Sequence, residues 1–255
     1  YVEKVVSAFK DDVRFWVTIN EPEFYTKNAY ISGTWPPGEK NILGYFAAFY
    51  NLIEAHIRAY KTIKIIQPEA QVGIAKDNIY FEAYPGQITS TLYAFLADWW
   101  WNRYFLNQIR RYQDFIGLNY YFHNRIKSFS LNQNANERVS DMGWELYPKG
   151  IYYVLRDLKK YKQPIYIMEN GVADARDRYR AWFISEHLRW VYNAIHEGVN
   201  VRGYFYWSLL DNLELARGFW PRFGLVEVDY RTLTRRVRPS ARSYAETIRM
   251  NGLDH

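Results

Sequence analysis

The sequence contains no cysteine, which excludes disulfide bonds and metal sites built from thiolates. It also lacks any apolar run of membrane-spanning length, and no signal peptide is visible. We therefore expect a cytoplasmic protein with no membrane partner. The chain starts abruptly at Tyr1, which leaves open whether a segment in front of it was removed.

A strong excess of one charge is also missing, because 27 acidic residues oppose 33 basic ones and leave a net charge of +6. The basic side chains are dispersed, and no nucleic-acid-binding motif accompanies them. We interpret the densest basic cluster as a solvated face and expect no nucleic-acid partner. A basic nucleic-acid binder, whose binding would collapse with salt, is the weaker alternative. The cluster consists of Arg231, Arg235, Arg236, Arg238 and Arg242.

Aromatic residues, by contrast, are abundant: 10 Trp, 24 Tyr and 15 Phe make up 19% of the 255 residues. This length suffices for a sizeable core, and we expect a single domain over residues 1–255. Core packing explains most of the aromatic residues. Those near predicted strand ends also suit a site that stacks the flat apolar faces of sugar rings.

Short apolar strands alternate with longer helical patterns along the chain. The strand signals begin near residues 15, 71, 114, 164 and 201, and the alternation predicts a parallel α/β sheet. Polar or aromatic residues follow four of these five strands, at the end where the sites of α/β barrels lie. Helices are predicted over residues 1–10, 43–67, 92–112, 148–161, 176–198 and 239–251, with a hairpin through 125–130 as an option.

Two of the strands end in the same way. Residues 15–22 and 164–171 are apolar segments, and each ends in a glutamate beside an asparagine, Glu21 and Glu169. Gly171 is expected to let the chain turn directly after the second strand. If both strands belong to one parallel sheet, the two glutamates face one pocket at the same edge of it.

Two carboxyl groups are the simplest means of breaking a glycosidic bond, since one protonates the leaving oxygen while the other attacks or directs water at the anomeric carbon. The acid has to keep its proton near neutral pH, so burial or a neighbouring charge must raise its pKa. Glu21 and Glu169 are the candidates for these roles. Each could instead be an ion-pair partner at a strand end, and that alternative stays open at this point.

Several further motifs run along the chain: TINEP (18–22), WPPG (35–38), NYY (119–121), YIMENG (166–171), WSLLDN (207–212), Glu214 and RFGL (222–225). Together and in this order they make the sequence similar to glycoside hydrolase family 1, the retaining β-glycosidases on a (β/α)8 barrel. The resemblance implies an α/β fold of TIM-barrel type, of which this chain accounts only for strands 4–8 and their helices. We expect no cofactor and no metal.

The resemblance implies roles for the two glutamates and a neighbour. Glu21 would be the general acid/base, Asn20 the amide that contacts the sugar 2-hydroxyl, and Glu169 the nucleophile that forms the glycosyl-enzyme. Retention of configuration requires the two carboxyl groups to lie about 5 Å apart.

Three further residues would bind the substrate according to the same resemblance. Tyr121 would donate a hydrogen bond to the nucleophile and keep it ionised, Trp207 would form the platform under the sugar ring, and Glu214 would bind the 4- and 6-hydroxyls. Core packing of Trp207 and strand-end packing of Tyr121 stay open as alternatives. Asp211 and Asn212 are assigned to turn structure.

The resemblance covers the family's C-terminal half or slightly more, because the first three strand–helix units have no counterpart. A sugar-binding Gln, an Arg beside the nucleophile and a His-Asn pair are missing with them. Five parallel strands cannot close an eight-stranded barrel without an exposed apolar edge. We expect the missing part to come from sequence not shown or from a second chain; a natural half-barrel that pairs with itself or has lost activity is the third explanation.

The sequence thus predicts a retaining β-glycosidase that removes terminal β-D-glucosyl, galactosyl or fucosyl residues from small β-glycosides. The rival interpretation is a degenerate half-barrel that acts as a non-catalytic carbohydrate-binding or interaction module. The absent strands favour the rival, as does Leu215, which stands where family members usually have a tryptophan.

Leu215→Trp is expected to improve turnover of an aryl β-glucoside. The indole N–H would restore a hydrogen bond to a sugar hydroxyl that is worth about 1–2 kcal/mol, or about a tenfold gain in kcat/KM. Release of nitrophenol measures the change. An unchanged or lower kcat/KM would contradict the assignment.

Overall fold

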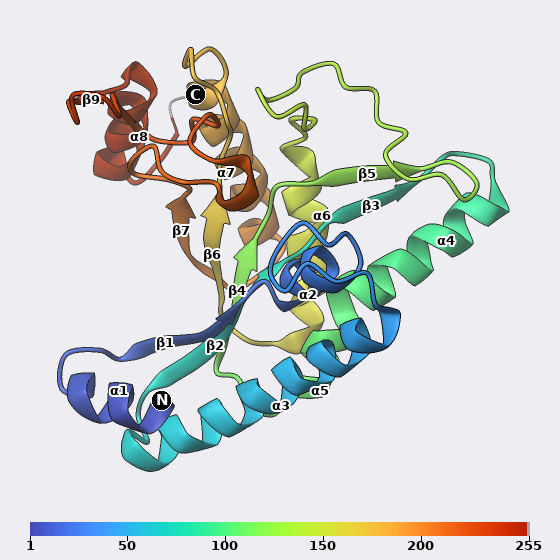
Figure 1. Cartoon of the computed structure of the whole chain (residues 1–255). Coiled ribbons are helices and arrows are strands. Elements are labelled where there is room, and N and C mark those ends of the chain that lie inside the picture. The colour runs from blue at the N-terminus through green and yellow to red at the C-terminus, as the bar shows by residue number, and fades with distance from the viewer. Residues whose placement is uncertain (254–255) are drawn as a thin grey trace.

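One five-stranded parallel sheet organises residues 1–253, the part of the chain that this computed structural model describes (Figure 1). Its strands lie in the order β1-β2-β4-β6-β7, and every neighbouring pair is parallel. All five carboxyl ends therefore meet at one edge of the sheet. The strands are β1 (Phe15–Asn20), β2 (Gln71–Asp77), β4 (Phe115–Asn119), β6 (Ile165–Asn170) and β7 (Val201–Tyr206).

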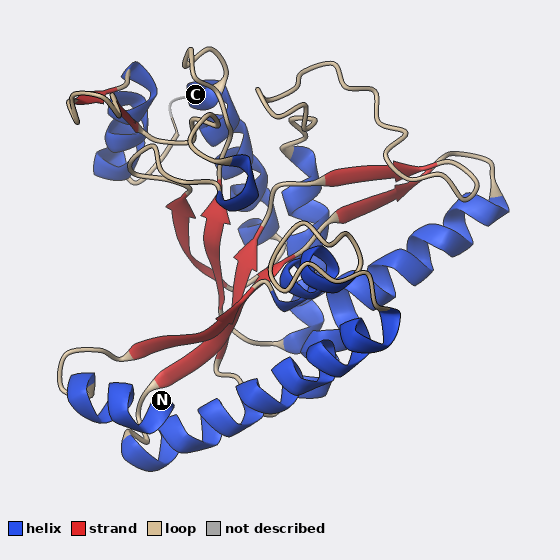
Figure 2. Ribbon diagram, viewed as in Figure 1, coloured by secondary structure: helices blue, strands red, loops and turns tan. Residues whose placement is uncertain are grey.

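Helices join these strands, and Figure 2 shows how helix and strand alternate along the fold. Within residues 1–253, no helix has both the length and the apolar character that a membrane crossing requires. The α-helices are α1 (Val2–Phe9), α2 (Pro22–Tyr30), α3 (Ile42–Ile66), α4 (Ile88–Asp98), α5 (Phe105–Ile109), α6 (Lys149–Leu158), α7 (Arg180–His196) and α8 (Pro239–Met250).

The five predicted strands are confirmed, whereas the predicted helix over residues 92–112 is interrupted. It begins four residues earlier, as α4, and passes through a π-helical segment, Trp99–Tyr104, before α5. The optional hairpin through residues 125–130 is reduced to a single antiparallel bridge. Four short strands were not predicted: β3 (Tyr80–Ala83), β5 (His123–Ile126), β8 (Val226–Val228) and β9 (Arg235–Val237).

The main core lies between the sheet and the helices on its outer face. Ile116 and Leu118 of β4 and Ile167 of β6 pack there against Phe49 of α3 and Leu155 of α6. Each of these five side chains is at most 1% exposed. Burial of one such side chain is worth about 1.5–3 kcal/mol, so this layer fixes the strands against the helices.

The inner face of the sheet alternates glycine with large side chains. The rings of Phe115 and Tyr166 meet edge to face at 5.4 Å between centroids. A Cβ atom on Gly73 would lie 2.6 Å from the Phe115 ring, and one on Gly117 would lie 2.8 Å from Met168. The glycines thus provide the space that the neighbouring side chains fill.

The two outer strands, β1 and β7, leave apolar side chains of the inner face uncovered among the described residues. Phe15 of β1 is 54% exposed, Val17 is 39% exposed, and Phe205 of β7 is 55% exposed. In a closed barrel β1 and β7 would each pair with a further strand, and the sheet would have no free edge. The exposed edge expected from five strands is therefore present.

The basic cluster near the C-terminus is not wholly a solvated face, so that prediction was wrong for one member. Arg238 is only 5% exposed and pairs with the buried carboxylate of Asp211 at 3.1 Å. It also donates to the carbonyl of Gly224 at 2.7 Å. Burial of an arginine requires such a partner, and the pair ties α8 to the loop after β7.

Gly117→Ala is expected to destabilise the fold by about 1–3 kcal/mol, because the new Cβ would lie 2.5 Å from the carbonyl oxygen of Ile74. Urea unfolding followed by circular dichroism measures the loss. Gly252→Ala is the matched control, since its Cβ would have no neighbour closer than 3.7 Å. Equal stability of the two variants would contradict this account of the inner face.

Candidate active site

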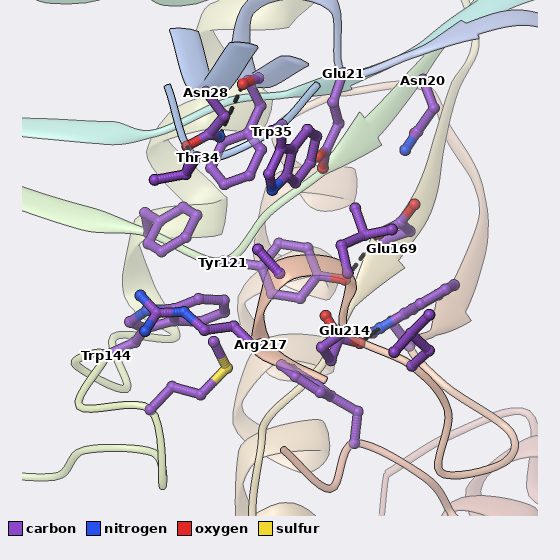
Figure 3. Close-up of a pocket in the computed structure, with 18 of the residues that line it drawn as sticks. Asn20, Glu21, Asn28, Thr34, Trp35, Tyr121, Trp144, Glu169, Glu214 and Arg217 are labelled. Atoms are coloured by element: carbon purple, nitrogen blue, oxygen red, sulfur yellow. Dashed lines mark hydrogen bonds between the residues drawn. The ribbon is translucent and has the colours of Figure 1, made fainter. Parts of the chain in front are cut away.

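All six site residues predicted from the sequence line one cavity of about 800 Å³ at the carboxyl edge of the sheet. Figure 3 shows the side chains of Glu21 and Glu169 reaching into this cavity from different strands. The volume is of the size that small-molecule sites have. The six residues are Asn20, Glu21, Tyr121, Glu169, Trp207 and Glu214.

Glu21 follows β1 directly and has a left-handed backbone conformation, with φ at +48°. Its N–H donates to the carbonyl of Ala75 on β2 at 2.8 Å, and α2 begins at the next residue. A left-handed residue other than glycine costs roughly 1–2 kcal/mol. The left-handed conformation turns the chain at Glu21, so that its side chain points toward the cavity (Figure 3).

Asn119, at the end of β4, joins the two candidate carboxylates. Its Nδ2 group donates to Glu21 Oε1 at 2.9 Å and to Asn20 Oδ1 at 3.1 Å. In the ladder between β4 and β6, Asn119 lies opposite Glu169. The residue belongs to a motif that the sequence singled out, but no role was predicted for it, because its contacts depend on the register of three strands.

Glu169 ends β6 and accepts a hydrogen bond from the hydroxyl of Tyr121 at 2.9 Å. Burial and the nearby carboxylates, Glu169 first, raise the pKa of Tyr121 well above its ordinary value, so the phenol stays protonated. Tyr121 is therefore a hydrogen-bond donor to Glu169 at neutral pH.

Trp207 and Glu214 close the other side of the cavity. The indole Nε1–H of Trp207 donates to Glu214 Oε1 at 3.1 Å (Figure 3). Gly171 does not have a positive φ; the chain instead needs glycine there because a Cβ would lie 1.8 Å from the Trp207 carbonyl oxygen. Leu215, 60% exposed, also lines the cavity beside Glu214.

Burial raises the pKa of both candidate carboxyl groups, and by different amounts. The pKa of Glu21 rises to about 8, through burial first and then the charge of Asp77. The pKa of Glu169 rises to about 7, through burial first and then the charge of Glu21, while hydrogen bonds from Tyr121 and Asn119 act in the opposite direction. The proton is therefore held more tightly by Glu21 than by Glu169.

A wider rim of the cavity was not predicted as part of the site. Trp35 and Phe24 form one wall and contact each other edge to face at 5.5 Å. Trp144 and Phe122 form another at 4.6 Å. The aromatic composition indicated such walls, but Trp35, Phe122 and Trp144 lie on loops whose course the sequence does not define, and only Phe24 lies on a helix, α2. Arg217, after the loop that carries Glu214, also points toward the cavity (Figure 3).

Comparison with known proteins gives the same family. The family model described as glycosyl hydrolase family 1 matches residues 1–111 and 102–253. The chain belongs to glycosyl hydrolase family 1. Its predicted membership of the family, its glycoside hydrolase class and its TIM-barrel type of fold are thereby confirmed.

Among the family 1 relatives, β-glucosidase A of Thermotoga maritima is 32% identical over the whole chain, which covers 67% of that protein. A β-galactosidase of Sulfolobus acidocaldarius is 33% identical over 93% of the chain, which covers 55% of it. The structure of the Thermotoga maritima β-glucosidase in complex with glucoimidazole superposes with a TM-score of 0.92 at 31% identity, over 100% of this chain and 68% of that one. The chain thus spans about two thirds or less of the length of its relatives.

Glu169→Gln is expected to stabilise the protein at pH 8 more than at pH 5. The folded-state pKa of about 7 exceeds the ordinary 4.5, so the contribution of the neutral carboxyl is full below pH 4.5 and is lost as the pH rises through 7. A permanently neutral amide avoids this loss, which amounts to about 1–3 kcal/mol. Thermal unfolding at both pH values measures it. Glu69→Gln, at an exposed position, is the control, and equal gains for the two variants would contradict the argument.

Proposed function

We propose that this chain carries the catalytic centre of a retaining β-glycosidase that removes terminal β-D-glycosyl residues from small glycosides. One observation carries the proposal: Glu21 and Glu169, from separate strands, open into the same cavity, and their pKa values differ. Burial and then Asp77 raise the pKa of Glu21 to about 8, whereas burial and then Glu21 raise that of Glu169 to about 7. A pair of carboxyl groups with different proton affinities is what double displacement needs.

In the first step, ionised Glu169 attacks the anomeric carbon while the bond to the aglycone oxygen breaks. The proton of Glu21 moves to that oxygen, and an ester joins Glu169 to the sugar. In the second step, the Glu21 carboxylate takes a proton from water, the water oxygen attacks the same carbon, and Glu169 leaves as a carboxylate. Two inversions give net retention.

The remaining residues bind and orient the sugar in this proposal. Tyr121, a donor at neutral pH, stabilises the Glu169 carboxylate before attack and after its release. Trp207 offers an aromatic face to the apolar face of the ring, and Glu214 accepts hydrogen bonds from the 4- and 6-hydroxyls. Asn20 contacts the 2-hydroxyl, with its amide oxygen already engaged by Asn119.

The sugar is a glucosyl, galactosyl or fucosyl group in this proposal. Relatives named β-glucosidase and β-galactosidase support the first two, and a related structure holds glucoimidazole. A cytoplasmic location is a further part of the proposal, as is the absence of nucleic-acid and membrane partners.

The open edges of the sheet support a second part of the proposal, that further polypeptide completes the barrel. Phe15 and Phe205 are more than half exposed on the inner face, at opposite edges. Three more strand–helix units, from the same longer protein or from a second chain, would cover both. An arginine supplied with them beside Glu169 would lower the pKa of that carboxyl from about 7.

A non-catalytic carbohydrate-binding or interaction module is the second candidate function. Leu215 favours it, because an apolar side chain beside Glu214 offers no hydrogen-bond donor to a sugar hydroxyl.

Turnover of nitrophenyl β-glycosides tests these alternatives. Glu169→Gly is expected to lower kcat by at least about 10⁴-fold and to give α-glycosyl azide when azide is added, because the small anion enters the space of the lost carboxylate. Glu69→Gly, at an exposed turn, is the matched control. Azide product of retained configuration would refute the role of Glu169, and saturable sugar binding without any turnover would establish the binding module instead.

A further inference from the structure

A group of charged side chains lies fully buried behind Glu21, outside the cavity. Glu23 of α2 and Lys76 of β2 are 0% exposed, and Asp77, the last residue of β2, is 1% exposed. None of the three lines the cavity that holds the candidate glutamates. Burial of three ionisable groups is unfavourable unless they are paired, so their arrangement calls for an explanation.

Lys76 is the centre of this group. Its Nζ lies 3.1 Å from Glu23 Oε1 and donates to the main-chain carbonyls of Asp77 at 2.9 Å and Trp101 at 2.6 Å. The ammonium therefore neutralises Glu23 directly. It contacts Asp77 through the main chain and forms no ion pair with the Asp77 carboxylate.

Asp77 is the group without a dedicated counter-ion. Its Oδ2 accepts from the indole of Trp101 at 3.2 Å, while its Oδ1 is buried and has no hydrogen-bond partner among residues 1–253. A structural role alone would be served by an asparagine or an apolar side chain. The carboxylate instead places a second acid beside the one buried ammonium of Lys76, which already pairs with Glu23.

The register of the sheet brings this charge close to Glu21. Asp77 lies opposite Asn119 in the ladder between β2 and β4, and the Asn119 side chain donates to Glu21 Oε1 at 2.9 Å. Glu21 itself bonds through its N–H to Ala75, two residues before Asp77 on the same strand. Because water is excluded around Asp77, its negative charge on β2 acts with little screening on Glu21, which follows the neighbouring strand β1.

We propose that Asp77 and Lys76 are opposed positioning residues for Glu21, Asp77 holding the proton on it and Lys76 limiting how tightly that proton is held. This inference rests on the proposed role of Glu21 as the acid/base. The pKa of Glu21, about 8, is consistent with it: after burial, the charge of Asp77 is the largest cause that raises it, and Lys76 lowers it.

The other groups that face Glu21 do not replace this pair. Glu23 pairs with Lys76 and raises the pKa of Glu21 less than Asp77 does. Glu169 is already needed as the ionised nucleophile, and Asn119 stabilises the charged form of Glu21. Burial also raises the pKa of Asp77, to about 7, while Lys76 lowers it, so Asp77 and Glu21 titrate as a pair in which the ionisation of one holds the proton on the other. The charged and titratable groups around Glu21 are Glu23 and Lys27 of α2, Lys76 and Asp77 of β2, Tyr121 after β4, Glu169 of β6 and Glu214 after β7.

A titration of the Glu21 carboxyl carbon by ¹³C NMR tests the pair without any turnover, with Glu21→Gln used to assign its signal. Asp77→Asn keeps the shape and the Trp101 contact, and it is expected to lower the midpoint of Glu21 by about 1 pH unit. Lys76→Met is expected to raise the midpoint by a similar amount. The same two variants should move the alkaline limb of kcat/KM in the same opposite directions.

Asp98→Asn is the matched control, because it also neutralises a largely buried acid. Asp98 pairs with Arg103 away from the site, so this variant should leave the Glu21 midpoint unchanged. If Lys76→Met fails to fold because Glu23 is left unpaired, Glu23→Gln combined with Lys76→Met replaces it, since the double variant removes both members of that ion pair and keeps Asp77. A midpoint of Glu21 that Asp77→Asn leaves unchanged or raises would overturn the inference. Absence of turnover in the wild type would refute the proposed function alone, since the NMR titration would still report the midpoints.

Discussion

Removal of carboxyl groups from water is the constraint on which this structure depends. The parallel sheet carries Glu21, Asp77 and Glu169 to one edge, where Asp77 is fully buried and the two glutamates are partly buried at the cavity wall. Charged carboxylates in such a place are unfavourable, so each either keeps its proton or finds a donor. Because their partners differ, the two glutamates have different pKa values although they are chemically alike.

The pairing register of the strands, more than the local sequence, determines which partner each carboxyl group meets. Asn119 contacts Glu21 because β4 is the second neighbour of β1, and it lies opposite Glu169 because β4 is the first neighbour of β6. A slip of one residue in either ladder would turn the amide away from both. The buried isoleucines on the outer face and the glycines on the inner face hold the register, so the core determines the electrostatics of the cavity.

The five-stranded sheet is closed by helices on its outer face and, within residues 1–253, open on its inner face. The helices that cover the outer face are complete, and the site has its glutamates, its tyrosine and its tryptophan. The inner face is the part that lacks a cover, next to Phe15 and Phe205. The fold therefore separates two features: the strands present gather the two glutamates in one cavity, whereas the inner face beside Phe15 and Phe205 stays open among the described residues.

The five strands of the main sheet and the six site residues could be predicted from the sequence. The contacts between distant elements could not, for physical reasons. The strands ending at Glu21 and Glu169 were visible because short apolar runs with polar ends have few other structures. The role of Asn119 and the buried pair of Glu23 and Lys76 were not, because they depend on contacts between distant strands and helices. Arg238 was mistaken for a surface residue because its partner, Asp211, lies far away in sequence.

The left-handed backbone at Glu21 has one more consequence. Glycine, asparagine or aspartate would suit that conformation better, and none of them would extend so long a carboxylic acid side chain toward the cavity. Replacing Glu21 by one of these three residues would relax the backbone, whereas most other residues would keep the strain. Backbone strain and the placement of a long carboxylic acid in the cavity thus meet at one residue, so the ease of folding and the position of this side chain make opposite demands on Glu21.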